Sequence, residues 1–414
     1  MRLVVQMIVD GRDAAGDAAS AMREKQLDVG VREKRVLARR QLLDLAESQG
    51  RDEVRVAAVA IVLVVDALLE LVLASDGMDR SVLHALLFPS SGRTTLSTVA
   101  SLDYIHVTYG EPHAQRSRQM LAAHPELREL SGPQPATALW IVALVVVQLA
   151  LAVLVGGLPW YIWVPAAYIA GATIDHALWA LIHDTCHNLV FRWRNGNRWA
   201  AILANLPLVV PGAISFGKYH LLHHRHMGDL EFDAGIPGPT EARVIGRSGL
   251  AKATWIAGTI FVQGVIRPSR MKKITLLDGW TIVNLVIQVA AMALLVALAG
   301  WAPLKYLLFS TVFAIGLHPL GARWIQEHFA LAPGQETYSY YGPLNKVSFN
   351  VGYHNEHHDI VNVPWSRLPD IRRIAPEFYN GLHSYSSWTT LLVRFLRDSN
   401  ITLFNAIVRP GRKD

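Results

Sequence analysis

Apolar positions along the chain gather in four long runs, separated by segments rich in polar residues. Each run has roughly the 17–25 residues that a helix needs to cross the hydrocarbon core of a bilayer. The runs cover residues 139–158, 161–182, 280–300 and 304–320. Short uncharged turns join the first to the second and the third to the fourth. The pattern therefore predicts an all-α integral membrane protein with four transmembrane helices in two hairpins.

The polar segments place these hairpins in the membrane. Most Lys and Arg residues of the membrane unit lie in the loop 183–279 and after residue 321, which predicts that both regions are cytosolic, together with the amino-terminal region. Within the loop, residues 199–214 and 253–266 are apolar but short and broken by Pro or Gly. We expect interfacial or re-entrant helices there.

The first hundred residues differ from the rest of the chain. They are rich in Ala, Arg and Asp up to about Arg55, and the apolar run 56–74 that follows carries Asp66 and Glu70, which are costly at a bilayer centre. We expect a surface-lying or packed helix in that run and no secretory signal. The predicted domains are an extension of unknown role at 1–100, a membrane unit at 101–400 and a tail at 401–414.

Composition supports a membrane protein and excludes several site classes. Hydrophobic residues make up 51% of the 414 residues, and charged residues only 17%. The net charge of +6 comes from basic residues that flank apolar runs, so we expect the lipid bilayer and no nucleic acid as partner. The single cysteine, Cys186, excludes a disulfide framework and any multi-cysteine metal site.

The 17 histidines carry the candidate chemistry. Three clusters have the spacings HxxxH, HxxHH and HxxHH, which place imidazoles on one helix face, and all three lie on the predicted cytosolic side. One such cluster is often a pair of surface histidines, but three on one membrane face predict a metal centre. A further histidine follows the fourth run. The nine predicted ligands are His183, His187, His220, His223, His224, His328, His354, His357 and His358. His84, His106, His124, His226 and His383 are interpreted as ordinary surface or interface residues.

The ligand set favours a redox metal pair. Catalytic zinc usually has three protein ligands, and the HExxH spacing of zinc proteases is absent, whereas nine nitrogens suffice for two irons with open positions. Nearby carboxylates either orient the ligand imidazoles or are solvated loop charges. Polar residues at membrane depth are further candidates for the surrounding shell. These candidates are Asp175, His176, Asp184, His318, Glu327, Glu356 and Asp359.

At these residues the chain resembles the membrane fatty-acid desaturase and hydroxylase superfamily, and most of all its sphingolipid (dihydroceramide) delta-4 desaturases. The resemblance spans about residues 103–397. It rests on GEPH at 110–113 with Arg116, Arg118 and HPE at 124–126, on ANLP at 204–207, ISF at 214–216 and KYH at 218–220, and on ETYSYYGPLN at 336–345 running into FNVGYHNEHHD at 349–359. Arg323 stands where relatives often carry another histidine.

The resemblance implies a di-iron oxidoreductase that uses O2 to desaturate a lipid chain entering from the bilayer. The implied substrate is dihydroceramide, oxidised at carbons 4 and 5 of its long-chain base. Electrons would come from an external carrier, a small haem protein or a ferredoxin with its reductase, because the chain has no haem-binding pattern and no GxGxxG fold. The basic stretch formed by Arg267, Arg270, Lys272 and Lys273 would bind anionic lipid headgroups, or dock an acidic carrier.

Three alternatives stay open from the sequence. An acyl-lipid or fatty-acid desaturase and a sphingoid carbon-4 hydroxylase would use the same scaffold. A membrane metal transporter would also use histidines, although transporters place their sites near the midplane. The Ala- and Arg-rich composition favours a bacterial cytoplasmic membrane, with the endoplasmic reticulum as the eukaryotic equivalent.

Overall fold

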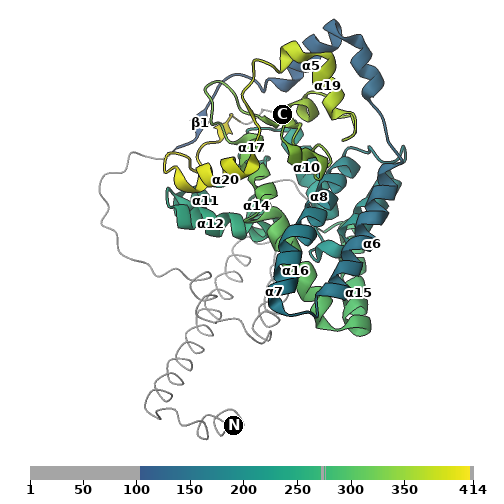
Figure 1. The fold of residues 1–414 in the computed structure, drawn as a ribbon. Helices are drawn as coiled ribbons and strands as arrows, with labels where there is room; N and C mark the ends of the chain where they lie inside the picture. The colour runs from purple at the N-terminus through teal and green to yellow at the C-terminus, as the bar shows by residue number, and fades with distance from the viewer. Residues whose placement is uncertain (1–102, 272–274, 276, 411–414) are drawn as a thin grey trace, which may run out of the picture. The chain divides into compact units, whose positions relative to one another are not determined.

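The computed structural model describes residues 103–271, 275 and 277–410. The predicted extension 1–100 lies outside the described residues. The longer helices are α5 (His113–Ala123), α6 (Thr137–Val155), α8 (Ala172–Cys186), α9 (Arg194–Asn205), α10 (Ala213–Arg225), α12 (Gly249–Ala257), α15 (Gly279–Ala299), α16 (Trp301–Ile315) and α20 (Trp388–Arg397) (Figure 1). The shorter ones are α7 (Trp160–Ala166), α11 (Pro239–Ile245), α13 (Thr259–Phe261), α14 (Arg267–Arg270), α17 (Arg323–His328), α18 (His354–Asp359) and α19 (Leu368–Ile374).

Three helical segments among the described residues are long and apolar enough to cross a membrane: α6, α15, and the run Trp301–His328 that joins α16, the 3-10 turn η5 (Pro319–Ala322) and α17. They match the first, third and fourth predicted spans. The second predicted span is a continuous helical segment made of α7, the π-helical turn η2 (Ala167–Gly171) and α8. It falls outside these three, so the structure supports a membrane helix bundle without fixing the four-span layout.

Helix α15 shows the polarity expected of a helix that faces lipid. Its buried residues are Thr281, Asn284 and Gln288, at spacings of three and four, whereas large apolar side chains such as Leu298 are exposed. Burying polar groups against protein and exposing apolar ones is favourable only where the surroundings are hydrocarbon. Asp278 caps the first turn by accepting from the Thr281 N–H at 2.9 Å.

Two bent helix pairs occupy the regions predicted as interfacial or re-entrant. Helix α9 with the 3-10 turn η3 (Leu206–Leu208) meets α10 at 117°, and α12 meets the segment Thr259–Arg270 at 62°. The backbone groups released at the first bend find partners in side chains. Asn205 binds Val210 O and Ala213 N, and Gln288 Nε2 donates to Leu206 O at 2.9 Å. The bend is therefore a stable feature, and it sets the direction of α10.

Outside the membrane-spanning segments, the chain forms two short parallel strand pairs that the sequence pattern did not predict. Strand β1 (Ile105–His106) pairs with β4 (Ile407–Val408), and β2 (Ser339–Tyr340) pairs with β3 (Ser384–Tyr385). The segment predicted as a tail is thus part of the core, with Leu403, Phe404 and Val408 buried. Helices α5 and α19 pack over a separate apolar cluster that contains Met120, Ile371 and Tyr379 (Figure 1).

Candidate metal centre

The nine predicted ligand histidines come together from four helices. Helix α8 carries His183 near its end, and His187 follows as its C-cap residue. Helix α10 carries three histidines, α17 ends at His328, and α18 carries three more. The bend before α10 and the turn before α17 direct these helices toward α8. The sequence-distant clusters therefore lie on one side of the helix bundle.

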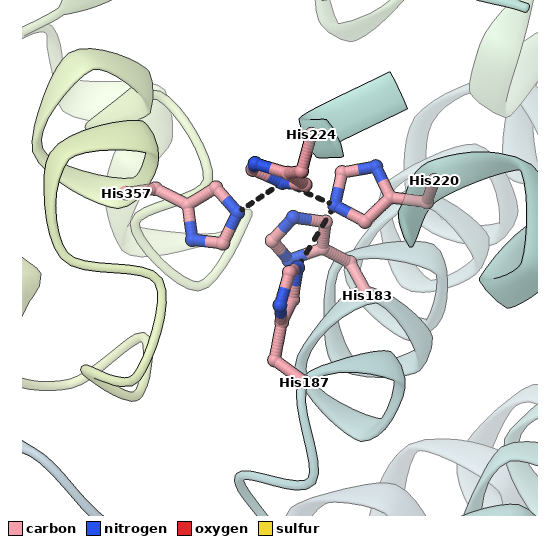
Figure 2. A group of neighbouring side chains, drawn as sticks. All are labelled: His183, His187, His220, His224 and His357. Atoms are coloured by element: carbon pink, nitrogen blue, oxygen red, sulfur yellow. Dashed lines mark hydrogen bonds between the residues drawn. The ribbon is translucent and has the colours of Figure 1, made fainter. Parts of the chain in front are cut away.

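Five of these histidines form a first group: His183, His187, His220, His224 and His357. One ring nitrogen from each lies within 4.8 Å of the others. Figure 2 shows the rings pointing toward one another, with Nε2–Nε2 distances of 2.9 Å for His187–His220, 2.9 Å for His220–His224 and 3.1 Å for His224–His357. The first group combines residues from all three clusters.

A second group consists of His223, His328 and His358, which meet the same 4.8 Å limit. His354 lies beside it, with its Nε2 2.9 Å from the Nε2 of His328. The rings of His224 and His358 are 4.2 Å apart, so the two groups adjoin. The structure thus places all nine predicted residues at one centre, divided five and four.

The chemistry of these side chains fits bound metal ions. The Nε2 of His358 is buried without a hydrogen-bond partner among the described residues. Burial, reinforced by neighbouring imidazoles, holds the pKa values of His354, His357 and His358 well below the usual range. Neutral imidazoles with converging nitrogen lone pairs are the form in which histidine binds metals.

Asp233 orients one imidazole of the second group, and it was not predicted from the sequence. Its Oδ1 lies 2.7 Å from His223 Nδ1, and its oxygens also accept from the N–H groups of Gly228 and Gly235. Burial favours the neutral acid, but the His223 charge interaction and these hydrogen bonds lower the Asp233 pKa to about 2. A carboxylate on Nδ1 leaves Nε2 of His223 directed at the second group. An Asp ten residues after a histidine was too weak a signal to find it.

The predicted carboxylates hold the histidines less directly. Asp184 Oδ1 lies 3.7 Å from His183 Nδ1, and Glu327 Oε1 lies 3.7 Å from His354 Nδ1. Both distances exceed a hydrogen bond. Glu327 also pairs with Arg323 at 3.4 Å.

Glu356 and Asp359 hydrogen-bond to residues outside the nine. Glu356 accepts from Ser339 at 2.6 Å and from Tyr341 at 2.7 Å, and burial raises its pKa to about 7. Asp359 binds His113, a histidine that the sequence analysis used only as part of a motif. Both carboxylates therefore act on α18 through other contacts.

The predicted polar residues at membrane depth lie apart from the two groups. Asp175 binds Gln148 and Thr311, His176 Nδ1 lies 3.0 Å from Ala314 O, and His318 accepts from Leu320 N. His176 does share a helical stripe with His183. Seven residues, however, correspond to about 10 Å along the axis. Among the described residues, none of these three contacts a predicted ligand.

The histidines interpreted as ordinary residues also lie away from the centre. His106 is exposed beside Asp103, His124 pairs with Glu126 and Glu377, His226 packs on Phe232, and His383 packs on Tyr338. His84 lies outside the described residues.

A small cleft adjoins the centre. Its lining includes His183 and His357 of the first group, His354 from beside the second group, and Asp184. The apolar wall is formed by Ala180, Phe349, Val351, Trp365 and Leu368. Apolar side chains therefore lie beside the ligand nitrogens.

The basic stretch has a structural role in its described part. Arg267 is buried and donates to the carbonyls of Ala234 and Gly235, while Arg270 donates to Leu230 O at 2.9 Å. These bonds secure the loop that carries Asp233. Lys272 and Lys273 lie outside the described residues.

A helix bundle with lipid-facing apolar surfaces and adjoining groups of histidines is typical of membrane metalloenzymes. The family model "Fatty acid desaturase" matches residues 158–389, and "Sphingolipid Delta4-desaturase (DES)" matches residues 101–136. The chain belongs to the fatty acid desaturase family.

Relatives in distant organisms match most of the chain. It is 42% identical to "Sphingolipid delta(4)-desaturase DES1-like" of Oryza sativa over 76% of its length and 95% of that protein. It is 40% identical to "Sphingolipid delta(4)-desaturase DES1" of Drosophila melanogaster over 76% of its length and 98% of that protein. "Sphingolipid delta(4)-desaturase/C4-monooxygenase DES2" of Bos taurus is 38% identical over 74% of the chain and 95% of that protein. These matches confirm the predicted resemblance and the prediction of an O2-dependent oxidoreductase, and they rule against the transporter alternative.

Proposed function

We propose that the chain is a di-iron desaturase that introduces a double bond into the long-chain base of a sphingolipid, converting a dihydroceramide to a ceramide. The observation that carries this proposal is the pair of adjoining histidine groups beside an apolar cleft. The relatives named sphingolipid delta(4)-desaturases supply the substrate class. The catalytic unit would extend past residue 400, since Leu403, Phe404 and Val408 belong to the core.

The histidines divide the metal-binding task. His183, His187, His220, His224 and His357 would hold one iron, and His223, His328, His354 and His358 the other. A reduced iron pair held there supplies the activation of O2 needed to remove hydrogen from an unactivated methylene. Asp233 keeps the His223 ring in the ligating orientation through its bond to Nδ1.

The cleft would position the lipid chain. Phe349, Val351 and Leu368 would contact hydrocarbon and exclude water, while Trp365 is fixed by bonds from its N–H groups to Asp184 and Thr137. Desaturation turns –CH2–CH2– plus O2, two electrons and two protons into –CH=CH– and two waters. The electrons come from a separate carrier protein, a small haem protein or a ferredoxin with its reductase.

The second candidate function is hydroxylation at carbon 4. It is favoured by the relative named a C4-monooxygenase as well as a desaturase. The same oxidant and electrons would then leave one oxygen atom on the chain and release one water. An acyl-lipid desaturase is the third possibility on this scaffold.

The membrane placement follows from the bundle. We propose that the protein spans the bilayer four times, with the histidine groups at the cytosolic face, in the cytoplasmic membrane of a bacterium. Labelling of single cysteines placed at the 157–159 turn and at Arg372 tests this arrangement. Opposite sidedness of the two positions is expected, and the same sidedness would contradict it.

The test of function supplies dihydroceramide to membranes containing the chain, with O2, reductant and a carrier protein. Mass spectrometry should show the loss of two hydrogens and a trans double bond between carbons 4 and 5. Addition of one oxygen would favour the hydroxylase. Conversion of an acyl lipid with dihydroceramide untouched would contradict the sphingolipid proposal.

A further inference from the structure

Helix α18 has two chemically distinct faces. His354, His357 and His358 point toward the two histidine groups, while the other three residues of the HNEHHD sequence, Asn355, Glu356 and Asp359, form polar contacts on the opposite side. Residues three and four apart share one face of a helix, so the three histidines lie together on one side and the other three residues lie on the opposite side. All six residues are buried, so the contacts of the second face determine how the helix is rotated.

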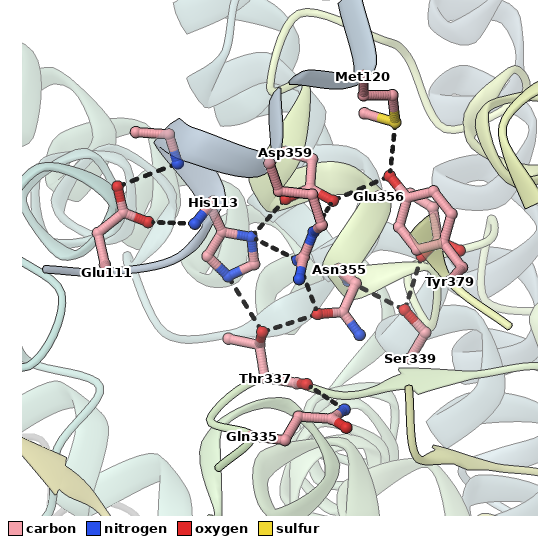
Figure 3. Close-up of polar contacts among 12 residues, drawn as sticks. Glu111, His113, Met120, Gln335, Thr337, Ser339, Asn355, Glu356, Asp359 and Tyr379 are labelled. Carbon is pink, nitrogen blue, oxygen red and sulfur yellow. Dashed lines mark hydrogen bonds and ion pairs between the residues drawn. The ribbon is translucent and has the colours of Figure 1, made fainter. Parts of the chain in front are cut away.

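Helix α5 supplies two of the partners of that second face, His113 and Arg116. Its first residue, His113, is buried, and the Glu111 carboxylate accepts from the N–H groups of His113 and Ala114 at 2.8 and 3.2 Å. This fixes the start of the helix and directs the His113 ring inward, as Figure 3 shows. Residues 101–136, which contain α5, are the part matched by the sphingolipid desaturase model.

Both nitrogens of His113 are occupied. Nδ1 lies 2.7 Å from Asp359 Oδ1, and Nε2 lies 3.0 Å from Thr337 Oγ1, which donates to Asn355 Oδ1 at 2.7 Å (Figure 3). The His113 ring is 4.9 Å from the ring of His358. His113 is therefore adjacent to the second histidine group, but its nitrogens form hydrogen bonds that hold α18, directly at Asp359 and through Thr337 at Asn355.

The Asp359 carboxylate makes three side-chain contacts in this network. Besides His113 it accepts from Arg116 Nε at 2.8 Å and from the Tyr379 hydroxyl at 2.9 Å, in a site with no solvent exposure of its side chain. Arg116 also reaches Asn355 Oδ1 at 3.3 Å. A buried charge-assisted network of this kind is costly to break, because each lost partner leaves a buried polar group unpaired.

We propose that His113 and Arg116 are positioning residues for the third histidine cluster: they hold α18 through Asp359 and Asn355, so that His358 and His354 face the second group. The inference rests on the proposed function, since it assigns a role in metal binding to the amino-terminal segment that marks the sphingolipid branch. That segment contributes to the metal centre through hydrogen bonds to its ligand helix.

The test uses the full chain, purified in lipid nanodiscs, stripped of metal and titrated with Fe(II) without O2. His113→Phe keeps an aromatic ring and removes both hydrogen bonds. It should weaken binding at the second group, which takes His358 and His354 from α18, about 10–100-fold, and weaken the first group less, because α18 supplies only His357 to it. The Mössbauer signature of the second iron should change as well. Arg116→Lys, which keeps the charge, should lie between wild type and Arg116→Met.

The matched control is His124→Phe, at the end of the same helix, where the side chain pairs with Glu377 on the surface. It should bind both irons like wild type. A purely structural role for His113 would lower the melting temperature of the metal-free chain and leave Fe(II) affinity and spectrum unchanged, and that result would overturn the proposal. If His113→Phe does not accumulate, Thr337→Val decides, since it removes only the Nε2 contact and the link to Asn355. Wild-type affinity in that variant would also overturn the proposal.

Failure of the proposed function would be visible separately. In that case the wild-type chain itself would bind no iron or give no lipid product. When wild type loads two irons, wild-type Fe(II) affinity and spectrum in the His113→Phe chain, or wild-type affinity in the Thr337→Val chain, reject the positioning role.

Discussion

The two histidine groups are assembled in different ways. The first has five converging nitrogens, and its nearest predicted carboxylate, Asp184, is 3.7 Å from an imidazole. The second has three nitrogens with His354 alongside, and it is tied to Asp233 at 2.7 Å and to the α5 network. The first group depends on the number of ligands and on helix packing, and the second on hydrogen bonds that orient its ligands. The two should therefore respond to different substitutions.

The largest effect on activity is expected from removing a histidine that lies where the two groups adjoin. His224 has its Nε2 within 2.9 Å of His220 and 3.1 Å of His357, and its ring is 4.2 Å from His358. His224→Ala should abolish product formation, measured as lipid product per chain, while membrane insertion is retained. His187→Ala and His357→Ala should behave alike. His383→Ala is the control and should keep wild-type turnover; full turnover by His224→Ala would contradict the assignment.

A smaller effect is expected from the carboxylates, and it separates the two groups. Asp233→Asn replaces a charged partner of His223 and should weaken metal binding at the second group by about 10–100-fold. Asp184→Asn should change binding at the first group less, because no hydrogen bond joins Asp184 to His183. Metal titration of both variants measures the contrast. Equal losses would remove the distinction between the groups.

The sequence predicted those features that depend on local spacing. Long apolar runs gave three segments that qualify as membrane spans, and HxxxH and HxxHH spacing gave eight of the nine histidines of the centre, with His328 added by its place after the fourth run. It could not predict how the histidines divide, because His223 and His224 are adjacent in sequence yet belong to different groups. Asp233 and His113 were missed for the same reason: their partners are set by loop and helix packing, as with Asp359, which lies 246 residues from His113.

The helix bend before α10 links the bundle to the centre, and weakening it should have a moderate effect. Gln288→Leu leaves the partly buried Leu206 carbonyl without its side-chain donor, which costs about 1 kcal/mol. The variant should unfold at lower temperature and lose metal affinity at both groups, since α10 carries His220 and His224 of the first group and His223 of the second. Val289→Leu, on the exposed side of the same helix, is the control. Unchanged thermal unfolding of Gln288→Leu would show that the bend needs no support from α15.

The smallest effect is expected at the start of α15. Asp278→Ala removes the cap on Thr281 N and should cost about 1 kcal/mol of the free energy of unfolding. Desolvation favours the neutral acid, but the Thr281 and Lys218 contacts together outweigh it and lower the Asp278 pKa to about 2. The capping contribution is therefore complete above the unfolded-state value of about 4 and is lost as the pH falls toward the folded-state value. The unfolding temperatures of wild type and Asp278→Ala should converge as the pH is lowered. A difference that stays constant with pH would show that the Asp278 carboxylate charge does not cause it.

The most direct test of the account is the metal content of the purified full chain, measured together with its Mössbauer spectrum after growth on isotopically enriched iron. Nine histidines in two adjoining groups predict about two irons per chain with nitrogen-rich coordination. A chain that is active on dihydroceramide but holds zinc, or a single iron, would contradict the central claim.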